Sequence, residues 1–429
     1  MKIMLFFYNL LLPIGFIFFI PGLLWKLWRR PGWKKTFGER FGWYKYERIK
    51  ELQAYKNGIW IHAVSVGESV IALALSRKLR QRCPDLPIVI STGTTTGQEL
   101  VRKQLPEGCT AIFCPIDFFW TVRKVLKMLT PKMLVIFETE IWPNLIVQAR
   151  KRGVKTALVN ARLSDHSAKG YKHFGFFFDP LLSKFDMIMA QSTGDRDRFM
   201  EVAPRARVVN CGNLKFDQSV PADLQAVDLD EVFGSGEKKI LLGASTHPGE
   251  EAVIAASFLE LQKTDPALRL VLIPRHAERG GEVMDVLRKM NITALRRSNN
   301  ERSADGNVSC LLADTTGEML KFMKSADVVI MGKSLAGHDE GHNLIEPALL
   351  KKAIVTGEKL RNFRFLMQVL TGKNAIRTVA DDRNLTPVLA ELLQDKALRD
   401  NLGLLAYQAI AEHAGASEKT LQELDKLLA

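Results

Sequence analysis

Short apolar runs alternate with amphipathic stretches along most of this chain, and no other feature constrains its fold as strongly. These runs are short and continuously apolar, without polar residues at every second position. Such runs are typical of parallel strands that helices cover on both faces. The pattern therefore predicts an α/β protein with doubly wound parallel sheets. The expected strands form two series, at residues 59–62, 88–91, 110–114, 133–137, 156–160, 187–190 and 208–210, and at residues 240–243, 268–273, 309–313, 328–331, 353–356 and 375–379.

The two series predict two domains of similar construction. A chain of 429 residues exceeds what a single core usually holds. Between the series, residues 218–238 are acidic, contain Pro and Gly and show no strong period, which indicates a linker. We therefore expect a first domain at 31–217 and a second at 239–407. Residues 384–428 look helical throughout, and a last helix is expected at 408–429.

An apolar segment opens the chain, from Ile3 to Trp25, and only Asn9, Pro13 and Pro21 interrupt it. It is long enough to cross a bilayer, and no small-x-small cleavage site follows it. We therefore expect an uncleaved membrane anchor at residues 1–30. Both a spanning helix and a helix that lies in one leaflet agree with this pattern.

Basic residues prevail in the chain as a whole and directly after the apolar segment. Lys and Arg number 60 against 47 Asp and Glu, a net charge of +13, which favours phosphate or an acidic membrane surface as partner. Nucleic acid is disfavoured, because no basic stretch is interleaved with aromatic residues and no recognition-helix or zinc-finger spacing occurs. The basic flank places the following domains on the cytoplasmic side under the positive-inside rule. It consists of Lys26, Arg29, Arg30, Lys34 and Lys35.

Polar residues gather after the expected strands of the first series, where open α/β sheets bind ligands. Glu68 stands in the first turn of a predicted helix, a position suited to a catalytic base. Glu138 and Glu140 follow another strand, where packing explains carboxylates poorly, so a functional role for one of them is favoured. For residues 91–97 and 160–164, ligand binding and simple helix capping are about equally favoured.

The second series repeats this arrangement. Residues 243–251 follow a strand and open a helix, whose positive dipole end favours an anionic group. Arg275 and His276 end the next strand, and an arginine there is suited to bidentate phosphate contact. Asn343 and Glu346 are three residues apart, so we expect them on one helical face, where the glutamate is placed to accept ribose hydroxyls.

Together these segments resemble the bacterial 3-deoxy-D-manno-octulosonic acid (Kdo) transferases of lipopolysaccharide synthesis. The order and spacing match over essentially the whole chain. Lys333, Glu340 and Glu358 depart from the family pattern, which usually has Gly, Gly and Pro there, and all three lie on the nucleotide side. The resemblance rests on residues 37–42, 64–68, 138–144, 160–164, 212–217, 274–276 and 341–347.

The resemblance implies a GT-B glycosyltransferase, with two Rossmann-like domains facing a cleft and an N-terminal membrane-anchor helix. It implies CMP-Kdo as donor, a lipid A precursor (lipid IVA) as acceptor and an inverting reaction. The enzyme would sit on the bacterial inner membrane, with anionic lipid as a further partner and its catalytic domains on the cytoplasmic face. The last helix would pack back on the first domain. No Asp-x-Asp cluster stands at a strand end, so we expect neither a metal nor another cofactor.

The resemblance also assigns roles to residues. Glu68 is the expected base that deprotonates the acceptor hydroxyl. Glu140 orients a hydroxyl of the acceptor or donor, with Glu138 as the alternative. The expected nucleotide-binding residues are Ser245, Arg275, His276, Gly341, Asn343 and Glu346. The expected substrate contacts are Thr94, Arg162 and Lys215, of which Arg162 or Lys215 would hold the carboxylate of the donor sugar.

Two other functions compete with this interpretation. One is a different membrane-associated GT-B enzyme with another nucleotide sugar as donor. The other is a non-catalytic membrane protein that binds anionic lipid. The presence of Glu68 together with Arg275 and Glu346 speaks against the second, because a tether needs none of these groups.

Overall fold

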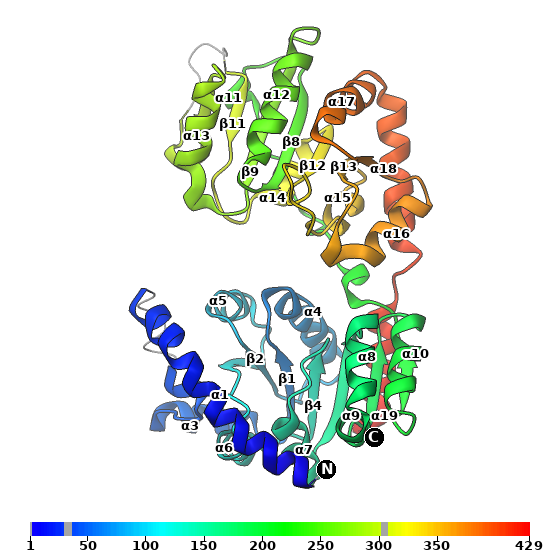
Figure 1. Cartoon of the computed structure of the whole chain (residues 1–429). Coiled ribbons are helices and arrows are strands. Elements are labelled where there is room, and N and C mark those ends of the chain that lie inside the picture. The colour runs from blue at the N-terminus through cyan, green and yellow to red at the C-terminus, as the bar shows by residue number, and fades with distance from the viewer. Residues whose placement is uncertain (1, 30–36, 302–307) are drawn as a thin grey trace. The chain divides into compact units, whose positions relative to one another are not determined.

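The computed structural model describes residues 2–29, 37–301 and 308–429. The chain forms two compact units, Met1–Asp217 with Ala414–Ala429, and Gln218–His413 (Figure 1). Each unit contains one of the two predicted series of strands, arranged as one sheet with its own buried core.

The sheet of the first unit has the order β3-β2-β1-β4-β5-β6-β7 in the described residues, and all its pairs are parallel. The chain moves outward from β1 to β3 and then returns to the other side of β1. This reversal makes the gap between β1 and β4 a topological switch point, where ligands bind in such sheets. The strands are β1 (Ile59–Ala63), β2 (Ile88–Thr92), β3 (Cys109–Phe113), β4 (Met133–Phe137), β5 (Lys155–Ala161), β6 (Met187–Ala190) and β7 (Val208–Asn210).

The sheet of the second unit repeats this topology, with the order β10-β11-β9-β8-β12-β13-β14 and only parallel pairs. Its switch point lies between β8 and β12. The strands are β8 (Lys239–Thr246), β9 (Leu268–Pro274), β10 (Ala294–Arg296), β11 (Cys310–Leu312), β12 (Val328–Met331), β13 (Ala353–Gly357) and β14 (Arg377–Val379).

The predicted strands are all present, with ends shifted by up to three residues. Strand β10 was not predicted. It is three residues long, half-buried and ends on an arginine, so it lacks the apolar run that marks the other strands.

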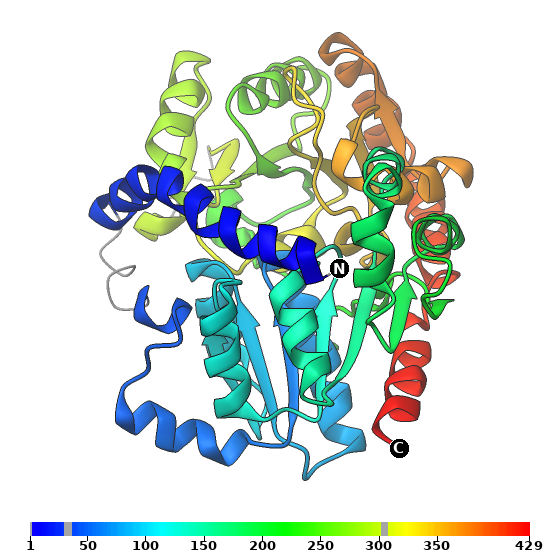
Figure 2. The same ribbon diagram turned by 60° about the horizontal axis from the view of Figure 1, so that its bottom comes forward.

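Helices cover both faces of each sheet in Figures 1 and 2, which explains why most strands are buried along their whole length. The first unit contains α1 (Lys2–Arg29), α3 (Tyr46–Leu52), α4 (Val66–Arg82), α5 (Thr95–Gln104), α6 (Phe119–Leu129), α7 (Pro143–Lys151), α8 (Asp165–His173), α9 (Gly175–Leu182), α10 (Thr193–Val202) and α19 (Ala416–Leu428). The second contains α11 (Asp230–Phe233), α12 (Glu250–Gln262), α13 (Gly280–Lys289), α14 (Met319–Ser325), α15 (Ile345–Leu349), α16 (Arg364–Gly372), α17 (Leu385–Gln394) and α18 (Lys396–Ala411).

Two expectations about helices need correction. Residues 384–428 are helical almost throughout, as predicted, with breaks at Asp395, whose side chain caps α18, and at residues 412–415; the last helix therefore begins at Ala416 instead of residue 408. The expected linker at 218–238 is also not wholly irregular. It contains the short helix α11, whose Val232 and Phe233 are buried.

Helix α1 lies against the rest of the first unit (Figure 2), and polar as well as apolar side chains make the contact. The hydroxyl of Tyr8 donates to Asp117 at 2.9 Å, and the amides of Asn9 and Asn144 exchange hydrogen bonds of 2.8 and 3.1 Å. In the part of the chain that the structure describes, no helix is long and apolar enough to cross a membrane. Arg30, Lys34 and Lys35 of the predicted basic flank lie outside the described residues.

The chain ends in the first unit, where α19 lies, coloured red in Figure 1. Asp217 accepts backbone hydrogen bonds from Gly415 and Ser417 at the start of this helix. Leu421 and Leu424 then enter the apolar cluster that also contains β1 and β4 residues. The last helix is therefore part of the first core.

Candidate active site

Glu68 lies at the start of α4, directly beyond the end of β1, as predicted. Ser65 caps the helix and accepts a hydrogen bond from the Glu68 backbone at 3.2 Å. The Glu68 carboxylate reaches back, and accepts from the Ser65 hydroxyl at 2.7 Å and from the Val64 backbone at 2.8 Å. This is a variant of the capping box, in which the carboxylate accepts from the residue before the cap, and it fixes the carboxylate in place before any substrate binds. Each of its oxygens keeps acceptor capacity for a further proton.

Glu138 and Glu140 follow β4, on the other side of the switch point. Trp142 donates its indole N–H to Glu140 Oε2 at 2.7 Å and thereby orients this carboxylate. The Trp142 ring also contacts the buried ring of His62 edge-on, with centroids 5.2 Å apart. The sequence did not single out Trp142, although it stands in the same motif as Glu140. Because β1 and β4 are adjacent, their ends bring Glu68 close to the two other glutamates.

The electrostatics of this group of carboxyl side chains raise two pKa values. Burial raises the pKa of Glu68, which is only 6% exposed, while its bonds to Ser65 and Val64 act against this, and the charges of Glu138 and Glu140 raise it further. Burial also raises the pKa of Glu140, the Trp142 bond lowers it, and Glu138 raises it. A carboxylate with a raised pKa holds a proton more strongly, as a general base requires.

Lys215 lies beside these carboxylates, where its ammonium pairs with Glu138 Oε1 at 2.7 Å. Asn160 helps to hold the segment of Lys215, because its side chain accepts from the Leu214 backbone at 3.0 Å. Glu138 has a left-handed backbone, with φ of 52°. The pairing was not predicted, since the partners follow different strands. It makes Glu140, whose bond to Trp142 leaves its second oxygen available, the better candidate for contact with substrate.

Thr94 and Arg162 follow β2 and β5, so both lie beyond carboxyl ends of the same sheet. The hydroxyl of Thr94 caps α5 by accepting from the Gly97 backbone at 3.0 Å. The capping interpretation of residues 91–97 therefore accounts for this side chain. Arg162 is exposed, next to Leu163, whose backbone donates to Asp195.

In the second unit, two histidines flank the switch point between β8 and β12. His247 follows β8, and His342 lies in the loop after β12; their Nε2 atoms are 3.1 Å apart. The pKa of His247 is lowered to about 4, mainly by burial and next by the charge of Lys333. The pKa of His342 is lowered to about 3, mainly by burial and next by the charge of Arg275. Both rings are therefore neutral at neutral pH, and one donates to the other.

The residues predicted to hold the nucleotide lie around this histidine pair. Arg275 is exposed at the end of β9, close enough to His342 and Glu346 to influence the pKa of both. Burial raises the pKa of Glu346, and Arg275 acts against this. The ring of His276 lies 6.3 Å from that of His247. Ser245, which has φ of 55°, is buried, and its hydroxyl contacts the sulfur of Met319.

The expectation that Asn343 and Glu346 share a helical face is wrong. Helix α15 begins at Ile345, so Asn343 precedes it, and its side chain accepts from the Ile345 backbone at 3.1 Å. Gly341 turns the chain toward this helix with φ of 75°. A Cβ atom at that position would lie 2.2 Å from Cγ of Leu360, so a glycine is required there for space as well as for conformation.

Glu250 was quoted within a motif but given no role, and the structure shows its importance. It is fully buried at the start of α12. Its carboxylate accepts four backbone hydrogen bonds of 2.8 Å, from His247 and from three consecutive residues of the loop after β12, namely Lys333, Ser334 and Leu335. This helix start thus carries the protein's own negative charge, and Glu250 ties the two loops of the switch point together.

Two of the three departures from the family pattern lie opposite each other. The ammonium of Lys333 is 3.8 Å from the carboxylate of Glu340. The backbone of Gly341 donates to the Lys333 carbonyl at 2.8 Å, so the loop is closed at this point. The third, Glu358, is exposed after β13.

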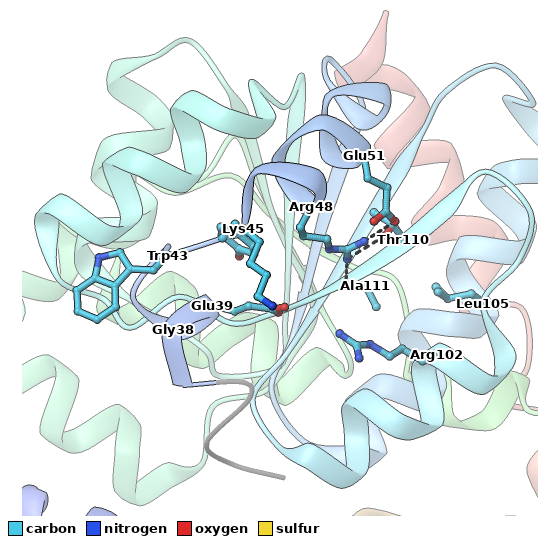
Figure 3. A pocket seen from close by; sticks show the side chains of 11 residues that line it. Gly38, Glu39, Trp43, Lys45, Arg48, Glu51, Arg102, Leu105, Thr110 and Ala111 are labelled. Atoms are coloured by element: carbon cyan, nitrogen blue, oxygen red, sulfur yellow. Dashed lines mark hydrogen bonds and ion pairs between the residues drawn. The ribbon is translucent and has the colours of Figure 1, made fainter.

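A separate cavity of about 590 Å³ lies at the outer edge of the first sheet (Figure 3). Arg48 crosses it and donates to the Thr110 hydroxyl at 3.3 Å and to the Ala111 carbonyl at 2.6 Å, while Arg102 lines it from α5. Its wall includes the middle of the edge strand β3, not the carboxyl ends of strands. We therefore treat it as distinct from the site at Glu68. Among the described residues, no group of His, Cys, Asp and Glu side chains is arranged to hold a metal ion, and metal independence stays a prediction.

Two doubly wound units with polar groups at both switch points define a protein of the two-domain Rossmann-like class. A solved glycosyltransferase from Rickettsia africae has this fold, with a TM-score of 0.58 at 12% identity, over 87% of this chain and 99% of that chain. At such identity the likeness concerns the fold alone.

The sequence comparisons identify the family. The family model of 3-deoxy-D-manno-octulosonic-acid transferase (kdotransferase) matches residues 35–218. A 3-deoxy-D-manno-octulosonic acid transferase from Haemophilus influenzae is 32% identical over 405 residues, 93% of both chains. One from Bordetella pertussis is 31% identical over 415 residues, 94% of this chain and 95% of the relative. The chain belongs to the Kdo transferase family and is a glycosyltransferase, as predicted.

Proposed function

We propose that this enzyme transfers Kdo from CMP-Kdo to a hydroxyl group of a lipid A precursor, with inversion, and that Glu68 is the base. The observation that carries the proposal is the meeting of Glu68 and Glu140 at the switch point of the first sheet. Burial and neighbouring carboxylates raise the pKa of both. Family membership supports the transferred sugar.

In the proposed reaction, Glu68 takes the proton of the acceptor hydroxyl while the hydroxyl oxygen forms a bond to the anomeric carbon of Kdo. The bond from that carbon to the phosphate oxygen breaks, and CMP leaves with the electron pair. The capping bonds from Ser65 and Val64 hold Glu68 still, so little reorganisation is needed at the moment of proton transfer. Glu140, fixed by Trp142, orients a substrate hydroxyl.

The second unit supplies the donor site in this proposal. Arg275 is exposed and suited to the phosphate of CMP, whose negative charge grows as the bond breaks. Glu346 accepts hydroxyls of the ribose. The pair of neutral histidines, His247 and His342, leaves one N–H near Arg275 that is not used between the rings, and adds no charge. The reaction as proposed uses no metal and no cofactor, since these side chains cover the developing charge.

The anchor and location are part of the proposal. Large apolar side chains of α1 are exposed, among them Phe6 at 64% and Phe18 at 80%. Such a surface favours insertion into one leaflet, with the polar contacts of Tyr8 and Asn9 holding the helix on the first unit. We propose monotopic attachment to the cytoplasmic face of the inner membrane, where an anionic surface suits the basic chain.

The test uses purified enzyme with CMP-Kdo and tetraacylated lipid A precursor, and mass analysis of the lipid product. We expect the mass of the lipid to increase by whole Kdo residues. In a binding assay, we expect CMP to bind and protect the enzyme, and UDP not to do so. Protection by UDP alone would favour a transferase with another donor. The variant Glu68→Gln retains the capping box, because glutamine also serves at this position. It should lose turnover by at least about a hundredfold and keep its CMP affinity; retained turnover would refute the base assignment.

A further inference from the structure

An apolar cavity of about 480 Å³ lies between α1 and the start of α9. Its lining comes from two separate segments and is almost entirely carbon. The one hydroxyl among these side chains, that of Tyr8, is turned to Asp117. The lining residues are Ile3, Met4, Phe7 and Tyr8 from α1, and Phe174, Phe176, Phe177 and Phe178 from the α8–α9 junction and α9.

Several of these side chains are exposed although they are large and apolar. Phe176 is 64% exposed, Phe7 53% and Phe174 51%. Leaving so much apolar surface in water is unfavourable, and an exposed apolar patch of this kind marks a binding surface. The lining requires an apolar occupant, because it offers no polar group to a hydrophilic one.

Two stacked rings extend from the cavity toward the proposed acceptor site. Phe178 lines the cavity and stacks on Tyr171, with centroids 3.8 Å apart and planes 9° from parallel. Tyr171 packs against the same apolar cluster as Trp142, the residue that holds Glu140, and Glu140 raises the pKa of Tyr171, after burial as the larger cause. A molecule with its hydroxyl at Glu140 therefore has an apolar surface leading to the cavity.

Helix α8, which precedes Phe174 and Phe176 in the chain, provides polar groups. Lys169 is an exposed cation, and His166 and His173, three and four residues away on the same face, supply imidazole groups. A phosphorylated head group would match this basic face, and the rings of Phe174 and Phe176 come directly after it.

We propose that this cavity binds an acyl chain of the acceptor lipid, and that it makes the enzyme selective for acylated, phosphorylated acceptors. The inference rests on the proposed function, and adds to it a subsite for the chain. The occupant is the substrate's own chain rather than a membrane phospholipid, because the stacked pair of Phe178 and Tyr171 and the apolar cluster shared with Trp142 lie between the cavity and Glu140.

The test compares two acceptors in detergent micelles: the acylated phosphorylated disaccharide and the same disaccharide without acyl chains. We expect the wild-type enzyme to have a lower KM for the acylated acceptor. Phe176→Ser should raise that KM about tenfold, since several methylene contacts are lost, and leave kcat and the KM for the deacylated acceptor unchanged. Phe7→Ser, which changes the α1 side of the cavity, should likewise raise the KM for the acylated acceptor and leave kcat and the KM for the deacylated acceptor unchanged.

Met200→Ser is the control, because Met200 on α10 is an exposed apolar residue of the same unit, at 49%, and lies outside the cavity and outside α1. Its kinetics in micelles should equal those of the wild type. The inference is overturned if Phe176→Ser changes both KM values equally, or if Met200→Ser has the same effect as Phe176→Ser. Absence of Kdo transfer by the wild type to either acceptor would instead refute the proposed function itself.

Discussion

At the scale of single residues, Glu68 has two tasks that its surroundings make compatible. As the last residue of a capping box it stabilises the start of α4, and as a buried carboxylate beside Glu138 and Glu140 it has a raised pKa. The capping bonds use one acceptor site on each oxygen and leave others for a substrate proton. The same side chain is therefore fixed and basic at once.

A pH profile tests this account. The pKa of Glu68 is raised, so its base form is lost as pH falls through a value above the ordinary 4.5, and kcat/KM should fall along that acid limb. Glu138→Gln removes one of the negative charges that raise this pKa, so the acid limb should move to lower pH. Steady-state kinetics at on the order of ten pH values between pH 4 and 8 would measure the position of the acid limb in both enzymes.

If the acid limb of kcat/KM lies at the same pH in Glu138→Gln as in the wild type, the charge of Glu138 does not raise the pKa of Glu68. Glu47→Gln provides the control, because Glu47 is an exposed residue in the first turn of α3, and its profile should match that of the wild type.

At the scale of elements, the loops at the second switch point depend on a buried carboxylate more than on their own sequence. Glu250, at the start of α12, binds backbone groups of both loops. These bonds come from backbone groups of the loop after β12, so they do not depend on the side chain at position 333. The same loop explains why spacing predicted the wrong place for Asn343, which lies before α15 and accepts from the backbone of Ile345.

Glu250→Gln should destabilise the second unit by about 3 kcal/mol, because one oxygen becomes an amide nitrogen and two buried backbone N–H groups lose their acceptor. Urea unfolding measures the change. Glu260→Gln, on the exposed side of the same helix and paired with Lys263 at the surface, should change stability by less than about 0.5 kcal/mol. Equal effects of the two variants would show that the four bonds to Glu250 contribute little.

At the scale of the whole molecule, the chain leaves the first unit, builds the second and returns. The returning helix α19 completes the first core with Leu421 and Leu424. Stability of the N-terminal unit thus depends on the last residues of the sequence.

Leu424→Ala should therefore destabilise the first unit by about 3 kcal/mol, since Leu424 is fully buried and its loss leaves a cavity. Hydrogen exchange read by mass spectrometry, segment by segment, would locate the effect. Peptides of β1 and β4 should lose protection, and those of β8 and β12 should not. The control is Leu404→Ala on α18, which is 42% exposed and should leave both sets unchanged. Loss of protection confined to the second unit would contradict the assignment of α19.

The sequence by itself determined the two sheets, the place of Glu68 at the start of a helix, and the family. Apolar runs and strand-end motifs are local patterns, so a single sequence displays them. Strand β10 was missed because its three residues lack such a run.

Only the tertiary structure decided which polar groups meet. The order of strands brings Glu68, after β1, to Glu140, after β4, and His247 to His342 in the second unit. The pairing of Lys215 with Glu138 and the four bonds to Glu250 likewise join residues from different strands and loops. Such contacts form because the order of strands in the sheet brings distant segments of the chain together at a switch point. The spacing of residues along the sequence does not give the distance between side chains that follow different strands.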